Sequence, residues 1–368
     1  MNTIRRLFQG TIFTANVVII ILFILSAYSD RVSPNTFVFM SYLGIAFPLL
    51  CLITAAFTVY WIISTEWRYF LLNMCCFLLC WGAIKNYCPY NPSSSETEIS
   101  KGNTIKVLTY NVMAFGYKNH TKESPNRILE YIANSDADIV CIQEYMESKS
   151  PKYLNREKIT KCLSMYPYYS IIPLKENKYQ LTGLAVFSKY PISKSRKIAY
   201  ETQFNGSSYH EITIKGKKLT LINNHLESFK LTNEDRSKYS TFIKSMGSDN
   251  FEKVKGSIQQ KLGPAFKIRA KQAEKVAEEI KKAANGRLLV CGDFNDTPIS
   301  YTHRTIQKGL KDAFAESGKG IGITYNQNFF WFRIDNIFYS PKMQSYNCTV
   351  DKIKDSDHYP LWCKLKPN

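Results

Sequence analysis

Charged residues are scarce at the start of this 368-residue chain. The first ninety positions contain only seven of them, namely Arg5, Arg6, Asp30, Arg31, Glu66, Arg68 and Lys85. Three successive uncharged runs leave no polar face for water, which argues against the buried core helices of a soluble domain. We therefore expect a membrane region over residues 1–90, with three transmembrane helices at about 8–28, 36–62 and 68–85.

The third uncharged run is shorter than the other two. It holds 16 residues between Arg68 and Lys85, whereas a spanning helix normally needs about 20 apolar residues. The first run could instead be a signal peptide, because Arg5 and Arg6 precede it and Ala27-Tyr28-Ser29 resembles a cleavage site. Both interpretations place the rest of the chain outside the cytoplasm, since basic residues at the start favour a cytoplasmic N-terminus. Failure of the third segment to cross would reverse this orientation.

Cysteine pairs of the kind that bind zinc are also missing. The chain has 10 Cys but no Cys-x-x-Cys spacing, which disfavours a zinc site. Cys141 and Cys291 lie inside apolar runs and are expected to be buried thiols. Cys348 and Cys363 could pair near the C-terminus.

Positive charge dominates the rest of the chain beyond the membrane region. From residue 91 onward there are 43 Lys and Arg against 28 Asp and Glu, which is +15 of the total net charge of +18. Such a domain favours anionic partners: membrane lipids, nucleic acid or other phosphates. A generic basic surface is the alternative, so charge alone does not choose a substrate. Residues 91–103 are polar and rich in turn formers and are predicted to be a linker.

Residues 104–368 alternate between strand and helix patterns. Apolar runs such as IKVLTYNV and DIVCIQE predict strands, and IRAKQAEKVAEEIKKA at 268–283 predicts a helix. Mixed strands with interspersed helices favour one α/β domain with packed sheets over a barrel of regular βα units. Residues 229–264 interrupt the pattern with a basic insertion that contains seven Lys or Arg. It could be a lid or platform that contacts the substrate or the membrane, or a small helical hairpin without such a role.

Six short segments carry polar residues at the ends of predicted strands. They are YNVMAFG at 110–116, CIQEY at 141–145, NNHLES at 223–228, CGDFND at 291–296, FRIDNIF at 332–338 and SDHYP at 356–360. A divalent-metal site that cleaves phosphate esters needs hard oxygen ligands, an activated water and an imidazole near the phosphorus. The segments together supply these groups.

Each polar residue also has an ordinary structural interpretation. Glu144 could be a solvated loop carboxylate, His225 a core histidine, and residues 296–298 a helix cap. Strand alternation, however, points Asp293 and Asn295 to the same side. A carboxylate and an amide placed together suit a water to be deprotonated and a phosphate oxygen to be held.

The Asp357-His358 pair predicts a turn, because adjacent strand residues point to opposite faces. Asp335 could accept the imidazole proton of His358 and raise its basicity. Its alternative role is a surface ion pair with Arg333.

The segments, in this order, resemble the endonuclease/exonuclease/phosphatase superfamily over about residues 104–366. The resemblance implies a DNase I-like fold, a four-layer α/β sandwich of two mixed β-sheets flanked by helices, with Mg²⁺ or Mn²⁺ as cofactor. The catalytic residues implied are His225, Asp293, Asn295, Asp335 and His358. The metal ligands implied are Asn111, Glu144 and Asp357. The substrate-binding residues implied are Asn224 and Arg333. Either Asp293 or His358 would be the general base.

Departures from the superfamily patterns narrow the expected activity. The chain lacks the Cys-Asp-Arg segment typical of inositol-polyphosphate 5-phosphatases, and His225 stands where abasic-site endonucleases usually carry Tyr. We therefore expect a phosphoesterase that hydrolyses a phosphodiester, of lipid head-group or nucleotide type, at an extracytoplasmic membrane surface. An extracytoplasmic DNase- or RNase-type nuclease is the alternative, and a non-catalytic membrane receptor or scaffold is a third.

Overall fold

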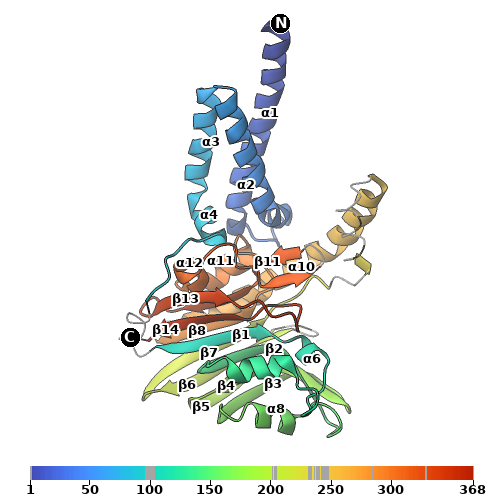
Figure 1. The fold of residues 1–368 in the computed structure, drawn as a ribbon, viewed down its shortest axis with the longest axis vertical. Helices are drawn as coiled ribbons and strands as arrows, with labels where there is room; N and C mark the ends of the chain where they lie inside the picture. Colours follow the sequence, from blue (N-terminus) through green and yellow to red (C-terminus); the bar gives the residue numbers. More distant parts are fainter. Residues whose placement is uncertain are drawn as a thin grey trace.

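The computed structural model describes residues 2–367 apart from 96–103, 201, 203–204, 231–233, 236, 238–240, 242–247, 284–285 and 328–329. A bundle of apolar helices stands on one end of an α/β domain (Figure 1). Most of the predicted linker, residues 96–103, lies outside the described part of the chain, as does much of the basic insertion.

Two N-terminal helices are long and apolar enough to cross a membrane. They are α1 (Asn2–Ala27) and α2 (Phe39–Ile63), and the short helix η1 (Ser29–Arg31) follows α1. The third expected span is not one helix. It consists of α3 (Trp67–Leu79) and α4 (Trp81–Tyr87), which meet at an angle of 62°. The bend occurs where α4 leaves the bundle and packs on the α/β domain, to which Asn86 donates a hydrogen bond at Pro298 O.

Polar side chains join the three long helices inside the bundle. Asn16 of α1 and Asn73 of α3 are fully buried and donate their amides to each other at 3.0 Å. Trp61 Nε1 of α2 donates to Asn16 Oδ1 at 2.7 Å. These contacts place α3 at the same level of the bundle as α1 and α2. The chain therefore runs toward the domain in α1, away in α2 and back in α3 (Figure 1).

The α/β domain is built on two six-stranded mixed sheets. The first has the order β13-β14-β1-β2-β4-β3, with bounds β13 Gln344–Val350, β14 Leu361–Lys366, β1 Ile105–Asn111, β2 Ile139–Ser148, β4 Gln180–Ser188 and β3 Tyr168–Glu176. The second has the order β5-β6-β7-β8-β12-β9, with bounds β5 Ile192–Ile198, β6 Gly206–Ile214, β7 Lys217–His225, β8 Arg287–Asp293, β12 Asp335–Tyr339 and β9 Lys311–Asp312. A separate hairpin pairs β10 (Tyr325–Gln327) with β11 (Phe330–Phe332). The pairs β1–β2 and β7–β8 are parallel and the other pairs are antiparallel.

Period-two alternation along the strands builds the layers. In β1, Val107 faces the core between the two sheets, whereas Leu108 faces the outer helices. The first sheet is covered by α7 (Arg127–Asn134) and α8 (Arg156–Cys162), and the second by α10 (Ser248–Ala283) and α11 (Tyr301–Gln307). The short helices α6 (Met113–Gly116) and α12 (Ala313–Ser317) complete the domain. The predicted four-layer DNase I-like sandwich is confirmed.

The cysteines of the domain are free thiols. Cys141 and Cys291 are fully buried in the core between the sheets, where burial raises the pKa of the Cys141 thiol well above its ordinary value. Cys348 and Cys363 are buried and are not joined by a disulfide.

The helix predicted at 268–283 begins earlier than expected. In the structure α10 starts at Ser248 and continues through Pro264, so it takes up the second half of the basic insertion. Its C-terminal half packs Ala273, Val276 and Ile280 against the second sheet. Its N-terminal half projects from the domain (Figure 1), which explains why the sequence there lacks the apolar period of a core helix.

Candidate active site

The predicted site residues lie at one edge of the two sheets. Asn111 ends β1, and Glu144 lies in the adjacent parallel strand β2. In the second sheet, His225 ends β7 and is paired in register with Asp293, which ends β8 and faces Asp335 at the start of β12. Parallel strands end at the same edge, so the topology brings all five residues together.

A bulge in β2 turns Glu144 toward the site. The register with β4 shifts between Ile142 and Tyr145, and Glu144 has a φ of 52°. Gln143 stays in the core, where its Nε2 donates to Asn223 Oδ1 at 2.6 Å. The side chain of Glu144, in contrast, is 37% exposed. Bulges commonly re-aim a side chain near active sites, and this one presents a carboxylate to solvent where the fully buried first half of the strand ends.

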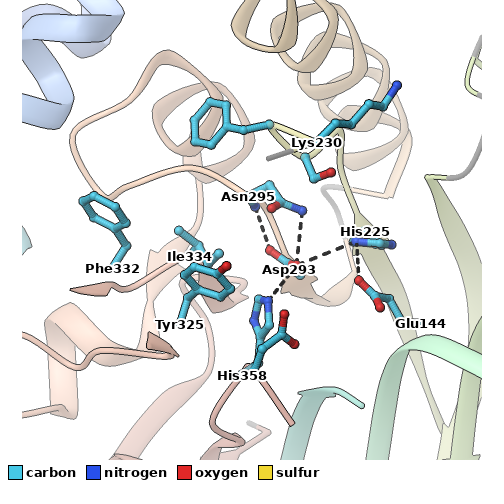
Figure 2. Close-up of a pocket in the computed structure, with 12 residues that line it drawn as sticks. Glu144, His225, Lys230, Asp293, Asn295, Tyr325, Phe332, Ile334 and His358 are labelled. Atoms are coloured by element: carbon cyan, nitrogen blue, oxygen red, sulfur yellow. Dashed lines mark hydrogen bonds and ion pairs between the residues drawn. The ribbon is translucent and has the colours of Figure 1, made fainter. Parts of the chain in front are cut away.

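Asp293 is the centre of the hydrogen-bond network (Figure 2). Asn111 Nδ2 donates to both Asp293 Oδ2 at 3.1 Å and Glu144 Oε1 at 3.2 Å. Asn295 donates its backbone N–H to Asp293 Oδ1 at 2.8 Å and its amide to Oδ2 at 3.2 Å. His225 Nε2 lies 3.6 Å from Glu144 Oε1 and 3.8 Å from Asp293 Oδ2. Two carboxylates are thus held close together by amide and imidazole groups.

His358 is held in a fixed orientation on the opposite side of Asp293. Its Nδ1 lies 2.8 Å from Asp335 Oδ2, and its Nε2 lies 3.6 Å from Asp293 Oδ2. The preceding turn is fixed by Ser356, whose hydroxyl donates to Asn111 O and accepts the backbone N–H of His358. The predicted partnership of Asp335 and His358 is therefore present in the structure.

The two central groups have strongly shifted pKa values. Burial lowers the pKa of His358, but the carboxylates of Asp335 and Asp293 outweigh it and raise the pKa to about 10. Burial raises the pKa of Asp293 to about 6, against the opposing effect of His358 and His225. At neutral pH the imidazole of His358 is therefore a cation beside an Asp293 carboxylate that is costly to keep charged.

These residues surround a cavity of about 140 Å³, which is large enough for several water-sized groups. Its walls comprise Glu144, His225, Ser228, Phe229, Lys230, Asp293, Asn295, Tyr325, Phe332, Ile334, Asp357 and His358. Asp357 therefore lines the cavity. Asp335 does not line it, but its carboxylate is hydrogen-bonded to His358, which does.

Two predicted substrate contacts do not reach the cavity. The amide of Asn224 is fully buried, donates to Cys291 O at 3.0 Å and accepts from the Ser207 hydroxyl at 2.6 Å, so it holds the strands of the second sheet together. Arg333 is also buried and donates to Asn86 O of α4. The prediction that Asn224 and Arg333 contact the substrate is corrected, because both side chains are engaged elsewhere, and Arg333 is not in a surface ion pair.

The chemistry of the site fits a divalent cation. Glu144 and Asp357 line the same cavity, and one ligand atom each from the neighbouring Asp293, Asp335 and His358 lies within 4.8 Å of the others. Asp335 Oδ1 is buried and has no hydrogen-bond partner among the described residues. Glu144 offers a partly exposed carboxylate beside them, and hard cations prefer such oxygen ligands. Asn111 bridges the Glu144 and Asp293 carboxylates through its amide nitrogen, which sets their spacing.

Arg269 is a site-supporting residue that the sequence analysis missed. This fully buried side chain donates to Asp296 Oδ2 at 3.0 Å and to Glu227 O at 2.6 Å. It therefore connects the two segments that follow Asp293 and His225. The sequence spacing could have indicated that Arg269 is buried, because it falls on the same face of the helix as Ala273, Val276 and Ile280.

The sequence of the α/β domain matches a family model that fits this site. The match covers residues 108–358 and is to the endonuclease/exonuclease/phosphatase family. The chain belongs to that family. Its members are hydrolases that act on phosphate esters and generally use divalent metals. Residues 5–87 match a second model, which describes a domain of unknown function. No curated protein matches the chain.

Solved structures of the same fold are only distantly similar. Caenorhabditis elegans TDP2 is 18% identical, with 72% of this chain and 98% of that chain covered and a TM-score of 0.46. The human Nocturnin catalytic domain is 18% identical, with coverages of 71% and 93% and a TM-score of 0.48. An endonuclease/exonuclease/phosphatase from Bacteroides vulgatus is 16% identical, with coverages of 72% and 100% and a TM-score of 0.46.

Proposed function

We propose that this protein is a Mg²⁺- or Mn²⁺-dependent phosphoesterase that hydrolyses a phosphodiester, of lipid head-group or nucleotide type, outside the cytoplasm at a membrane surface. The observation that carries the proposal is the network around Asp293. It brings His225 and His358 within 3.8 Å of one buried carboxylate, with Glu144 bridged to that carboxylate through Asn111. All eight residues assigned to catalysis or metal binding lie in this network or line its cavity.

The metal would be held by Glu144 as principal ligand and by Asp357, with Asn111 fixing the Glu144 carboxylate. When bound, the ion would supply positive charge to the phosphoryl oxygens. The chain's own residues would perform the proton transfer. Asp293 orients the attacking water and accepts its proton, since three N–H groups already fix the direction of this carboxylate.

The two imidazoles would stabilise charge on the phosphoryl group. His358 is fixed by Asp335 and stays protonated near neutral pH, so it can donate from Nε2 to a phosphoryl oxygen. His225 faces the same cavity from β7. Asn295 has its amide engaged with Leu226 O and Asp293, so its role is to position Asp293. In the balanced reaction, water oxygen bonds to phosphorus, one ester P–O bond breaks, and the departing alcohol leaves protonated.

The proposed side of the membrane follows from the helix directions. Arg5 and Arg6 belong to the start of α1, at the end remote from the domain (Figure 1). Basic residues favour the cytoplasmic side, so three crossings would put the domain outside. Protease accessibility of the C-terminus in sealed cells tests this, and protection of the C-terminus until the membrane is permeabilised would contradict it.

Hydrolysis of bis(p-nitrophenyl) phosphate by the detergent-solubilised full chain tests the activity. We expect a chelator to abolish hydrolysis and Mg²⁺ or Mn²⁺ to restore it. Glu144→Gln should weaken metal activation, whereas Glu157→Gln, at an exposed position of α8, is the matched control. Activity that survives chelation, or equal behaviour of the two variants, would refute the metal assignment.

A further inference from the structure

The cavity has two chemically different sides. Glu144, His225 and Asp293 lie on one side and Phe332 and Ile334 on the other, while the ring of Tyr325 packs against that of His358 with centroids 5.1 Å apart (Figure 2). A phosphate group needs charge and hydrogen bonds but no apolar contact. The apolar side would therefore contact another part of the substrate.

Another part of the cavity wall, at Phe229, is connected to the apolar N-terminal helices. The ring of Phe229, at the cavity wall, packs edge-on against Phe266 at 5.3 Å, and Phe266 packs edge-on against Tyr42 at 5.5 Å. Tyr42 lies in the first turn of α2, which begins at Phe39. Two aromatic rings thus span the distance between a membrane helix and the cavity wall.

A second connection runs through the strand that carries Phe332. Arg333 follows Phe332, precedes Ile334 and donates to Asn86 O at the end of α4. Ile299, six residues after Asp293, packs into the apolar cluster of the N-terminal helices with Phe23 and Phe47. The cavity is therefore built on segments that contact the domain-proximal ends of α2 and α4 and the helix cluster itself.

Exposed apolar side chains also lie on the hairpin that carries Phe332, around a second hollow separate from the cavity. Trp331 of β11 is 53% exposed and lies beside Ile321, which is 45% exposed. Figure 1 places β11 at the end of the domain that carries the membrane helices. Tryptophan favours the membrane interface, where its apolar ring and its N–H are both satisfied.

The charge at the cavity does not suit a nucleic acid. Among the described lining residues, Lys230 is the single Lys or Arg, and its Nζ lies 2.6 Å from Glu227 Oε1. Nucleic-acid binding relies on several unpaired cations along the backbone path. A small phosphodiester with an attached apolar group matches the lining better.

We infer that the substrate is a phospholipid of the same bilayer. Its phosphodiester head group would enter the cavity, and its hydrocarbon chains would extend past Phe332 and Phe229 toward the bilayer, with Trp331 at the membrane surface. This inference rests on the phosphodiesterase activity proposed above. Water would add to phosphorus with its proton passing to Asp293, one ester P–O bond would break, and a protonated alcohol and a phosphomonoester would result.

The test uses the full chain reconstituted in phosphatidylcholine vesicles that also contain phosphatidylethanolamine, phosphatidylglycerol and sphingomyelin. Phosphorus-31 NMR follows lipid hydrolysis, and bis(p-nitrophenyl) phosphate and a single-stranded oligonucleotide serve as soluble substrates. We expect at least one lipid to be cleaved with kcat/KM at least about tenfold above that of the oligonucleotide. Trp331→Glu should lower the ratio of lipid to bis(p-nitrophenyl) phosphate hydrolysis by about tenfold, because a charge replaces an interfacial ring.

Tyr168→Glu is the matched control. Tyr168 is 41% exposed on β3, at the end of the domain remote from the membrane helices (Figure 1), so this change should leave the ratio within about twofold. Preferential cleavage of the oligonucleotide, or equal ratios for Trp331→Glu and Tyr168→Glu, would overturn the lipid inference while leaving the phosphoesterase proposal intact. Failure to cleave every substrate, bis(p-nitrophenyl) phosphate included, would instead overturn the proposed function and this inference with it.

Discussion

The bundle of apolar N-terminal helices and the α/β domain both bury polar side chains, but these side chains have different surroundings. In the helix bundle, Asn16, Asn73 and Trp61 satisfy one another, and no charge is involved. In the α/β domain, Asp293 and Asp335 are buried close together beside His358, and burial and charge shift the pKa values of Asp293 and His358 in opposing directions. Buried polar groups whose hydrogen bonds are all made hold helices together. Buried ionisable groups whose pKa values are shifted by burial and by neighbouring charges are available for proton transfer.

The largest expected effect on activity comes from substitutions in the cluster of Asp293, Asp335 and His358. Asp293→Asn keeps the size of the side chain but removes the carboxylate that would accept a proton. We expect hydrolysis of bis(p-nitrophenyl) phosphate to fall by roughly 10² or more, as is typical for loss of a general base, and His358→Ala to cause a similar loss. Stability should change little or rise, because Asp293→Asn relieves a carboxylate whose pKa burial has raised.

Initial rates and thermal unfolding check this pair of effects. Asp136→Asn, at an exposed position, is the control for the charge change. If either variant hydrolyses the substrate at a rate within about tenfold of the unmodified protein, the residue substituted in that variant is not catalytic.

Arg269 offers a test of the support behind the cluster. Arg269→Met keeps the side-chain volume but leaves Asp296 buried without its cation and Glu227 O without its donor. We expect a loss of about 3 kcal/mol in the free energy of unfolding. Lys271→Met, exposed on the same helix, should have little effect. If urea unfolding gives equal midpoints for the two variants, the contacts of Arg269 with Asp296 and Glu227 O do not stabilise the domain.

Two buried histidines in the domain sharpen the comparison. His358 lies against carboxylates and has a raised pKa, whereas His210 is bonded to the hydroxyls of Ser195 and Ser208 and burial lowers its pKa to about 4. The unfolded chain takes up a proton near pH 6.5, but the folded protein does so only near pH 4. Stability must therefore fall as the pH drops between these values, by roughly 2 kcal/mol from pH 6.5 to pH 5.

His210→Gln removes this titration. Urea unfolding at pH 6.5 and pH 5 should show a smaller pH dependence for the variant than for the unmodified protein. An identical pH dependence in the two proteins would show that His210 is not responsible for the loss of stability in acid.

The sequence predicted which polar strand ends meet at one edge of the sheets better than it predicted the surroundings of that cluster. Strand ends with Asn111, Glu144 and Asp293 could be recognised because their chemistry is local to short segments. The side chains of Asn224 and Arg333 are engaged by Ser207 on the neighbouring strand and by Asn86 of α4, and local composition shows neither the strand pairing nor the packing of α4 on the domain. The early start of α10 and the bend between α3 and α4 likewise depend on packing between distant segments, and local composition cannot show it.

The smallest expected effect concerns the fully paired cluster in the membrane region. Asn16→Leu leaves the Asn73 amide and Trp61 Nε1 without their shared acceptor. Interhelical hydrogen bonds in membranes are typically worth about 1 kcal/mol, so we expect a loss of that size in the stability of the bundle in detergent. The double variant Asn16→Leu with Asn73→Leu should recover part of the loss, because it also removes the unsatisfied Asn73 amide and leaves only Trp61 Nε1 without its acceptor. Hydrolysis of a soluble phosphodiester should not change in either variant. A clear fall in hydrolysis in a variant that remains folded would contradict this expectation. It would mean that the helix bundle affects the geometry of the candidate active site.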